Sequence, residues 1–351
     1  MSAFNAERRS RIIATDEESS PRHEQLKRWL AGIDGLDATT LAPASEDASF
    51  RRYLRLASGD STRIVMDAPP EREDSAQFIK VAGFLERMHL NSPRVLASDL
   101  DLGFLLLTDL GSTLYLTALR TDRSKADELY DDAISALVTM QRRGKEFQSE
   151  LPPYDERLLA FELSIFKEWL CERHLNIDFT QSDEDRWQES CQLLIDNALE
   201  QPRVFVHRDY HSRNLMLTED DNPGILDFQD AVEGPLTYDL VSLLKDCYIR
   251  WPEEKIQVWT MQFYDQLGDH LTAQIDPRQF ARYFDLMGAQ RHLKAAGIFA
   301  RLKHRDGKSG FIPDIPRTLE YIEALESKYE ELGFLTNLIS RRCLPGLRES
   351  R

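Results

Sequence analysis

The chain has 351 residues, of which 60 are acidic and 44 are Lys or Arg, so its formal net charge is −16. This length favours two units with separate cores over one compact core. The acidic balance argues against a nucleic-acid-binding surface, which needs clustered basic residues, and against an anionic membrane as the main partner. Plain solubility accounts for the acidity, and a cationic substrate would also suit it.

The four cysteines are widely spaced and resemble neither a zinc site nor a disulfide framework. The first residues are polar and charged, without the apolar segment of a signal peptide. We therefore expect a cytoplasmic protein from a reducing compartment, with a polar lead-in over residues 1–20.

The first part of the chain predicts a small lobe of strands and helices. Leu26, Trp29 and Leu30 follow helical spacing. Runs of β-branched and aromatic residues separated by a Ser-Gly-Asp turn indicate a strand pair. The predicted elements are a helix at 21–31, strands at 50–57 and 62–66, a helix at 74–88 and a strand at 104–108. We assign an N-terminal nucleotide-binding lobe to residues 21–110, with a hinge at about 107–113.

The remainder, residues 114–345, predicts a larger and mainly helical lobe. Two short apolar runs, 203–206 and 224–228, interrupt it as strands that flank a polar segment. The expected fold is α+β and bilobal, with a small mixed sheet in the first lobe. The predicted helices cover 124–143, 153–175, 183–199, 238–248, 252–267, 277–302 and 316–332.

The polar segment and the turn after it carry the chemistry. Phosphoryl transfer needs a carboxylate that accepts the proton of the attacking hydroxyl, together with oxygen ligands for a metal ion that bridges to the nucleotide phosphates. Asp209 would be the base, and Asn214 and Asp227 the metal ligands. One Asp or Asn in a polar loop is usually a turn residue, but this combination between two strands is much more specific. His207 is expected to order the loop rather than to carry a proton.

The runs HRDYHSRN, ILDFQDA and TYDL resemble the aminoglycoside phosphotransferase family, whose members are relatives of the protein kinases. The resemblance implies a protein-kinase-like fold, ATP and Mg²⁺ as cofactors, and a small-molecule hydroxyl as acceptor. It implies that His211 lies in the substrate site and that Asp239 braces the backbone of the catalytic loop. Arg208 departs from the glycine that is frequent in the family.

The motifs for nucleotide binding in the predicted N-terminal lobe are weaker than those of the catalytic segment. The segment Ser49-Phe50-Arg51-Arg52 stands where protein kinases have a glycine-rich loop, and Asp67 stands where they have a strand lysine. Either arginine could supply the missing positive charge, and both could equally be solvated charges at a strand edge. The resemblance places Thr108 and Leu110 in the segment whose backbone would bind adenine.

Within the family, the segments around Arg52, Asp67, Gln229 and Arg291 resemble bacterial kinases that act on the anomeric hydroxyl of N-acetylmuramate and N-acetylglucosamine. This implies a role in peptidoglycan recycling in the cell wall, with an amino sugar and a nucleotide as partners. The acidic charge predicts no nucleic acid and no membrane as partners. The sequence does not indicate the oligomeric state, and a monomer is the expectation. A lactyl carboxylate would need a nearby cation. The candidate substrate-binding residues are His211, Arg213, Gln229, Arg291 and Lys294.

Two alternatives remain open at this point. A kinase for an aminoglycoside, choline or another cation would suit the acidic surface, although the side chains around Asp209 are basic. A catalytically inactive kinase fold that serves as a binding module would explain the missing lysine and glycines. An exposed charged helix face is the alternative role for Arg291 and Lys294.

Overall fold

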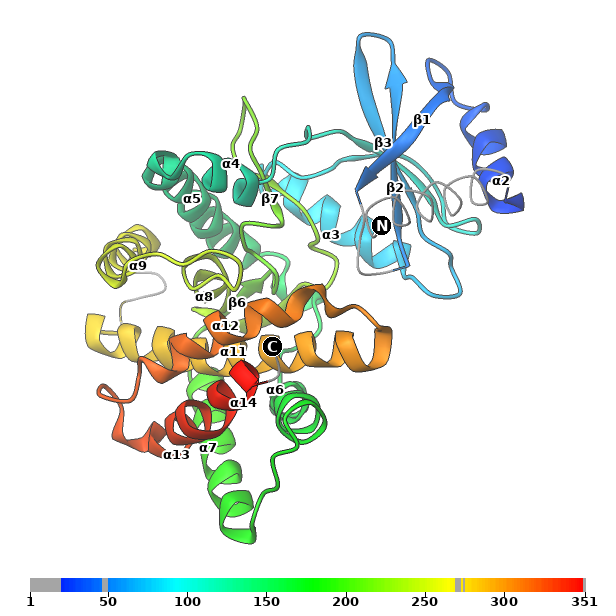
Figure 1. Ribbon diagram of the computed structural model, residues 1–351. Helices are drawn as coiled ribbons and strands as arrows, with labels where there is room; N and C mark the ends of the chain where they lie inside the picture. Colours follow the sequence, from blue (N-terminus) through cyan, green and yellow to red (C-terminus); the bar gives the residue numbers. More distant parts are fainter. Residues whose placement is uncertain (1–19, 46–49, 269–272, 274, 350–351) are drawn as a thin grey trace. The chain divides into compact units, whose positions relative to one another are not determined.

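The computed structural model describes residues 20–45, 50–268, 273 and 275–349. The chain divides into two compact units (Figure 1). The first unit comprises residues 1–83 and 93–112, and the second comprises residues 84–92 and 113–351.

The first unit is built on an antiparallel five-stranded sheet in the order β1-β2-β3-β5-β4. β2 and β3 are joined by the tight turn that the Ser-Gly-Asp sequence predicts, and Ser58 pairs with Ser61 across it. The strands are β1 (Asp37–Ser45), β2 (Arg52–Ser58), β3 (Ser61–Asp67), β4 (Val95–Asp99) and β5 (Phe104–Thr108).

Helix α2 (Pro21–Leu30) packs on this sheet. The Ser20 side chain caps the helix by accepting from the His23 N–H at 3.2 Å, and Pro21 occupies the first turn, where its missing N–H costs no hydrogen bond. The buried side chains that join the helix to the sheet are Leu26, Leu30, Leu56, Val65, Phe104 and Leu106. A further helix, α3 (Ser75–Arg87), follows β3 and continues into the second unit.

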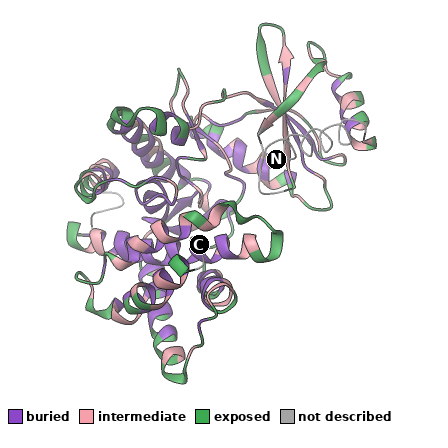
Figure 2. Ribbon diagram, viewed as in Figure 1, coloured by how far each residue is buried: buried purple, intermediate pink, exposed green. Residues whose placement is uncertain are grey.

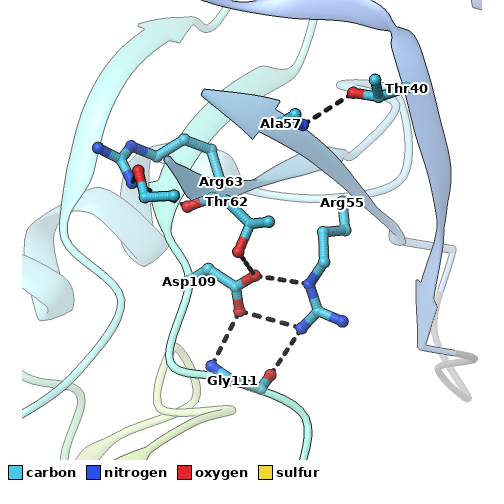
Figure 3. A network of polar contacts seen from close by, with 8 residues as sticks. Thr40, Arg55, Ala57, Thr62, Arg63, Asp109 and Gly111 are labelled. Atoms are coloured by element: carbon cyan, nitrogen blue, oxygen red, sulfur yellow. Dashed lines mark hydrogen bonds and ion pairs between the residues drawn. The ribbon is translucent and has the colours of Figure 1, made fainter. Parts of the chain in front are cut away.

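The chain that leaves β5 is fixed by Asp109 (Figure 3). Arg55 on β2 donates from Nε to Asp109 Oδ2 at 2.5 Å, and Thr62 on β3 donates from Oγ1 to the same oxygen at 2.6 Å. Arg55 Nη2 also reaches the Gly111 carbonyl at 2.6 Å. Burial would raise the pKa of Asp109, but the bonds from Arg55 and Thr62 outweigh it, so the pKa is lowered and the carboxylate is charged.

The second unit is mainly helical and is organised around α11 (Pro277–Asp306). Figure 2 shows this helix buried along most of its length, and its buried residues run from Phe280 to Ala300. It contacts α6, α7, α8 and α12. The helices around it are α4 (Tyr115–Thr121), α5 (Ala126–Gly144), α6 (Glu156–Ile165), α7 (Gln181–Leu199), α8 (Tyr238–Leu244), α9 (Glu253–Leu267), α12 (Ile315–Glu323), α13 (Gly333–Leu338) and α14 (Leu344–Glu349).

Two short antiparallel ladders lie within this unit. β6 (Arg203–Val206) pairs with β9 (Val232–Pro235), and β7 (Leu215–Met216) pairs with β8 (Gly224–Ile225). The short segments η1 (Arg123–Lys125), η2 (Gln148–Glu150), η4 (Ser309–Asp314) and η5 (Glu330–Leu332) are 3₁₀-helical, and η3 (Phe166–His174) and η6 (Ile339–Cys343) are π-helical.

The α+β class predicted from the sequence is confirmed, with three corrections. Strands β1 and β4 were not predicted, and the sheet of the first unit is antiparallel rather than mixed. The predicted helix over 316–332 ends at Glu323. All four cysteines are buried and unbridged, as the sequence predicts. Among the described residues, no helix is long and apolar enough to cross a bilayer.

Candidate active site

The catalytic loop, residues 207–214, leaves β6 and enters β7. Two hydrogen bonds hold it against the segment that carries Asp227. His207 Nε2 lies 2.9 Å from the Leu226 carbonyl, and the Leu226 N–H donates to the Asn214 carbonyl at 2.9 Å. Tyr210 anchors the loop from beneath, because its hydroxyl donates to the Ala133 carbonyl on α5 at 2.8 Å.

Asp239, at the start of α8, holds the first turn of the loop by its backbone. Its two carboxylate oxygens accept the N–H groups of His207 at 2.6 Å and of Arg208 at 2.9 Å. Burial raises the pKa of Asp239 to about 7, and the two backbone bonds act in the opposite direction. The side chain is fully buried and faces the loop, so its contacts are with the loop backbone.

Asp209 is half-buried and lies among cations. Burial would raise its pKa, but the positive charges of Lys294, Arg291 and Arg208 outweigh burial and lower it. Asp209 is therefore ionised at neutral pH, which is the state in which a carboxylate accepts a proton.

Asn214 and Asp227 lie beside each other, although thirteen residues separate them in the chain. Asn214 Nδ2 donates to Asp227 Oδ2 at 3.2 Å and to the Asp209 carbonyl at 3.0 Å. Gln229 Nε2 donates to Asp227 Oδ1 at 2.8 Å. The bonds of Asn214 use its amide nitrogen, so its oxygen and the Asp227 carboxylate form a pair of hard oxygen ligands of the kind that Mg²⁺ prefers.

These ligands fit a magnesium ion that is completed by phosphate oxygens and water rather than by a closed protein cage. Among the described residues, no cluster of three or more His, Cys, Asp or Glu side chains is arranged to hold a metal ion. A cation that keeps several water ligands and is shared with a nucleotide needs only one or two protein groups.

Glu162 on α6 carries a buried ion network behind the loop. Its Oε1 lies 2.6 Å from Arg208 Nη2 and 2.9 Å from Lys294 Nζ, and its Oε2 accepts from Tyr154 and from Gln290. The Glu162 side chain is 2% exposed. Burial would raise its pKa, but the Lys294 and Arg208 cations outweigh burial and lower it. Sequence reasoning missed this residue, because a Glu on an amphipathic helix usually lies in water.

Arg208 has a backbone φ of 79°, in the left-handed region that favours glycine. This conformation costs a non-glycine residue about 1–2 kcal/mol. The ion pair with Glu162 gives the side chain a stabilising contact that a glycine would lack. The residue that stands here in place of glycine is therefore one of the two cations that pair with Glu162.

The remaining predicted substrate residues fall into two groups. Lys294 is buried and also donates to the Tyr238 hydroxyl at 2.8 Å, and Arg291 is buried with Nη1 3.7 Å from Cys247 Sγ. The exposed charged face considered for α11 is therefore wrong at these two positions. His211 is buried beside the Tyr248 ring, and Arg213 is exposed.

In the first unit, the two arginines proposed for the nucleotide are paired with carboxylates. Arg51 Nη2 lies 2.8 Å from Glu73, and Arg52 Nε donates to Asp67 at 3.1 Å. Arg22 Nε donates to the other Asp67 oxygen at 2.7 Å, so this buried carboxylate, which the sequence left without a counter-charge, has two. Asp67 is therefore compensated within its own unit.

The other predicted nucleotide residues are placed in the first unit as follows. Phe50 is 58% exposed under the Arg72 guanidinium. The Thr108 hydroxyl accepts from the Arg94 N–H at 2.9 Å, and Leu110 follows β5. Ser49 lies outside the described residues.

Comparison with known proteins shows the family of this chain. A model described as the phosphotransferase enzyme family matches residues 40–284. A protein of Pseudomonas aeruginosa named N-acetylmuramate/N-acetylglucosamine kinase is 45% identical over 332 residues, covering 91% of this chain and 96% of the relative.

Solved structures share the fold at low identity. Choline kinase LicA from Streptococcus pneumoniae has a TM-score of 0.60 at 13% identity, covering 88% of this chain and 100% of that one. ADP-bound aminoglycoside phosphotransferase APH(2'')-Ib has a TM-score of 0.55 at 14% identity, covering 86% of this chain and 97% of that one.

Fold and relatives together define the class of this protein, a kinase-like phosphotransferase with a hydroxyl group as acceptor. The chain belongs to the phosphotransferase enzyme family.

Proposed function

We propose that this chain transfers the terminal phosphoryl group of ATP to the anomeric hydroxyl of N-acetylmuramate and N-acetylglucosamine, as a cytoplasmic step of peptidoglycan recycling. The observation that carries the reaction type is the position of ionised Asp209 beside the Asn214–Asp227 pair. The choice of acceptor is supported by the name of the relative that is 45% identical. The choice of nucleotide is supported by the ADP bound to a structural neighbour, the aminoglycoside phosphotransferase APH(2'')-Ib.

Asp209 is the general base in this proposal. It accepts the proton of the sugar hydroxyl as the oxygen attacks the phosphorus, and such a group contributes about 10²–10⁴ in rate. A hemiacetal hydroxyl is more acidic than an ordinary alcohol, so a carboxylate whose pKa is lowered is basic enough. Asp239 and the Glu162 network keep the loop in position, and the basic side chains around Asp209 suit a neutral or anionic acceptor better than a cationic one.

Asn214 and Asp227 would hold Mg²⁺, which when bound neutralises charge that develops on the transferring phosphoryl group. Gln229 fixes the Asp227 carboxylate through its 2.8 Å bond. In this proposal, the predicted nucleotide-binding residues of the first unit bind the nucleotide through their backbone groups. The side chains of Arg51 and Arg52 already have carboxylate partners.

The direct test is phosphorylation of N-acetylmuramate, N-acetylglucosamine, choline and kanamycin in parallel, with ATP and Mg²⁺. We expect turnover with the two amino sugars, and a phosphorus resonance coupled to the anomeric proton of the product. Turnover with choline or kanamycin alone would reject the acceptor, and phosphorus coupled elsewhere on the sugar would reject the anomeric position.

Asp209→Asn tests the base. The variant keeps the size of the side chain but cannot accept the proton, so turnover should fall by at least about 100-fold while the KM for ATP changes little. Asp230→Asn is the matched control, because Asp230 is an exposed carboxylate after the Asp227 turn and should retain turnover. Retained activity in Asp209→Asn would remove Asp209 from the mechanism.

A further inference from the structure

Arg213 is the residue of the catalytic loop that immediately precedes Asn214, and its side chain faces two aromatic rings. Its guanidinium carbon lies 4.7 Å from the centre of the Tyr248 ring and 5.4 Å from the centre of the Phe311 ring. A planar guanidinium that stacks on rings loses rotamer freedom before any ligand arrives and keeps its edge available for hydrogen bonds.

The charge of Arg213 is not neutralised within the described part of the chain, where no carboxylate lies within ion-pair distance of it. The positive charge of Arg213 favours the ionised form of the Asp314 carboxyl group. The ion pair of Asp314, however, is with Arg317, at 3.0 Å. The other two cations predicted for the acceptor lie in the interior, whereas Arg213 is exposed. Lys294 pairs with Glu162, and Arg291 is buried against Cys247.

The rings belong to a wall that begins at the catalytic loop. The His211 and Tyr248 ring centres are 5.4 Å apart, those of Tyr248 and Phe299 are 6.2 Å apart, and Phe299 stacks on Phe311 at 5.5 Å. His211 and Phe299 are buried, and the half-buried Tyr248 and Phe311 are the two members of this wall on which the guanidinium of Arg213 stacks.

Asp246 fixes this wall relative to the base. It is fully buried; one of its oxygens accepts the Ser212 N–H at 3.0 Å, and the other accepts the Tyr248 N–H at 2.8 Å. The residue next to Arg213 and the backbone of its stacking partner are thereby held by one carboxylate. The hydrogen bonds of Asp246 to the backbone of Ser212 and Tyr248 therefore help to set both the conformation of the loop and the position of the Arg213 guanidinium.

We propose that Arg213, stacked on Tyr248 and Phe311, is the carboxylate-binding subsite of the acceptor and determines selectivity for the acidic sugar, N-acetylmuramate, over the neutral one, N-acetylglucosamine. The proposal rests on the proposed function and names the residue that separates its two substrates. A guanidinium binds a carboxylate through two parallel N–H···O bonds, which a neutral sugar lacking the lactyl group cannot form.

The test compares kcat/KM for the two sugars in wild type, Arg213→Gln and Arg213→Lys. A hydrogen bond to a charged group corresponds to about 10- to 100-fold in binding. Arg213→Gln should therefore lower kcat/KM for N-acetylmuramate by about 10- to 100-fold while N-acetylglucosamine changes by less than about threefold. Arg213→Lys should recover part of the loss, because it restores the charge without the planar fork.

Three further measurements sharpen the result. The methyl ester of N-acetylmuramate keeps the bulk of the lactyl group but not its charge, so wild type and Arg213→Gln should treat it alike. Raising the salt concentration should narrow the wild-type preference for the acid. Arg173→Gln is the matched control, since Arg173 is also exposed and stacked on a ring, 4.1 Å from Trp169, but lies on η3.

Equal loss for both sugars in Arg213→Gln, or no loss for either, would overturn the subsite. Failure of the subsite can be told apart from failure of the proposed function. Wild type that phosphorylates neither sugar rejects the proposed function, whereas wild type that uses both and a variant that keeps the same ratio rejects only the role of Arg213.

Discussion

Both units contain a buried carboxylate that pairs with two basic side chains, Asp67 in the first and Glu162 in the second, and these two networks serve different purposes. In the first unit, Asp67 on β3 pairs with Arg22 on α2 and Arg52 on β2. In the second unit, Glu162 on α6 pairs with Arg208 of the catalytic loop and Lys294 on α11. The first network ties a helix to a sheet, and the second sets the position of charges around Asp209, the proposed base.

The two networks also differ in how far their cations reach water. The side chains of Arg22 and Arg52 are 27% and 31% exposed, whereas those of Arg208 and Lys294 are 20% and 11% exposed. A cation near water can be solvated when its partner is removed, and a cation in the interior cannot. Removing the carboxylate should therefore lower the free energy of unfolding more in the network near the catalytic loop than in the network at the sheet.

Glu162→Gln should have the largest effect on this comparison. It leaves the buried Lys294 and the half-buried Arg208 without a counter-charge, and removing one partner of a buried ion pair costs about 3–5 kcal/mol. Turnover should fall as well, because Arg208 and Lys294 both help set the charge around Asp209. Urea unfolding and turnover measure the two effects. Glu168→Gln, which breaks an exposed pair with Arg173, is the control and should cost less than about 1 kcal/mol.

Asp67→Asn should have a smaller effect on stability. The amide can still accept hydrogen bonds, and both freed arginines can turn toward water, so the loss should be about 1–3 kcal/mol by urea unfolding. A loss equal to that of Glu162→Gln would show that exposure of the cations does not separate the two networks.

The smallest expected effect is a pH dependence. The folded-state pKa of Glu162 is lowered below its ordinary value of 4.5, so its contribution to stability is present above that value and is lost as pH falls toward the folded-state pKa. The difference in unfolding free energy between wild type and Glu162→Gln should therefore be full at pH 7 and smaller at pH 4. A difference that stays constant between these pH values would contradict ionised Glu162 as the source of the stabilisation.

The sequence predicted those parts of the site that are local in the chain. Asp209 and Asn214 share one loop, and Asp227 follows β8, the second short strand after that loop, so spacing alone indicated them. Helix α2 was predicted well, because Leu26 and Leu30 follow a helical period after a proline start. Strand β1 was missed because Pro43 and a break in its pairing with β2 weaken the strand pattern.

The parts that the sequence could not predict depend on packing between distant segments. Glu162 and Lys294 look like ordinary surface charges, and they meet only because α6 packs on α11. Arg291 is buried because helices surround α11 along this stretch, which no periodicity of its own sequence reveals. The pairing of Arg51 with Glu73 was likewise not predicted, whereas Arg52 and Asp67 face each other across the β2–β3 pair that the turn at 58–60 indicates.

Asp239 binds the backbone N–H groups of residues 207 and 208 rather than their side chains. This contact therefore does not constrain which amino acid stands at position 208. The backbone conformation at the start of the loop is thus fixed by a residue outside the loop, at the start of α8. A glycine at position 208 would remove the backbone strain there, but it would also remove an ion-pair partner of Glu162. A substitution at position 208 should therefore be tolerated best when position 162 is changed with it.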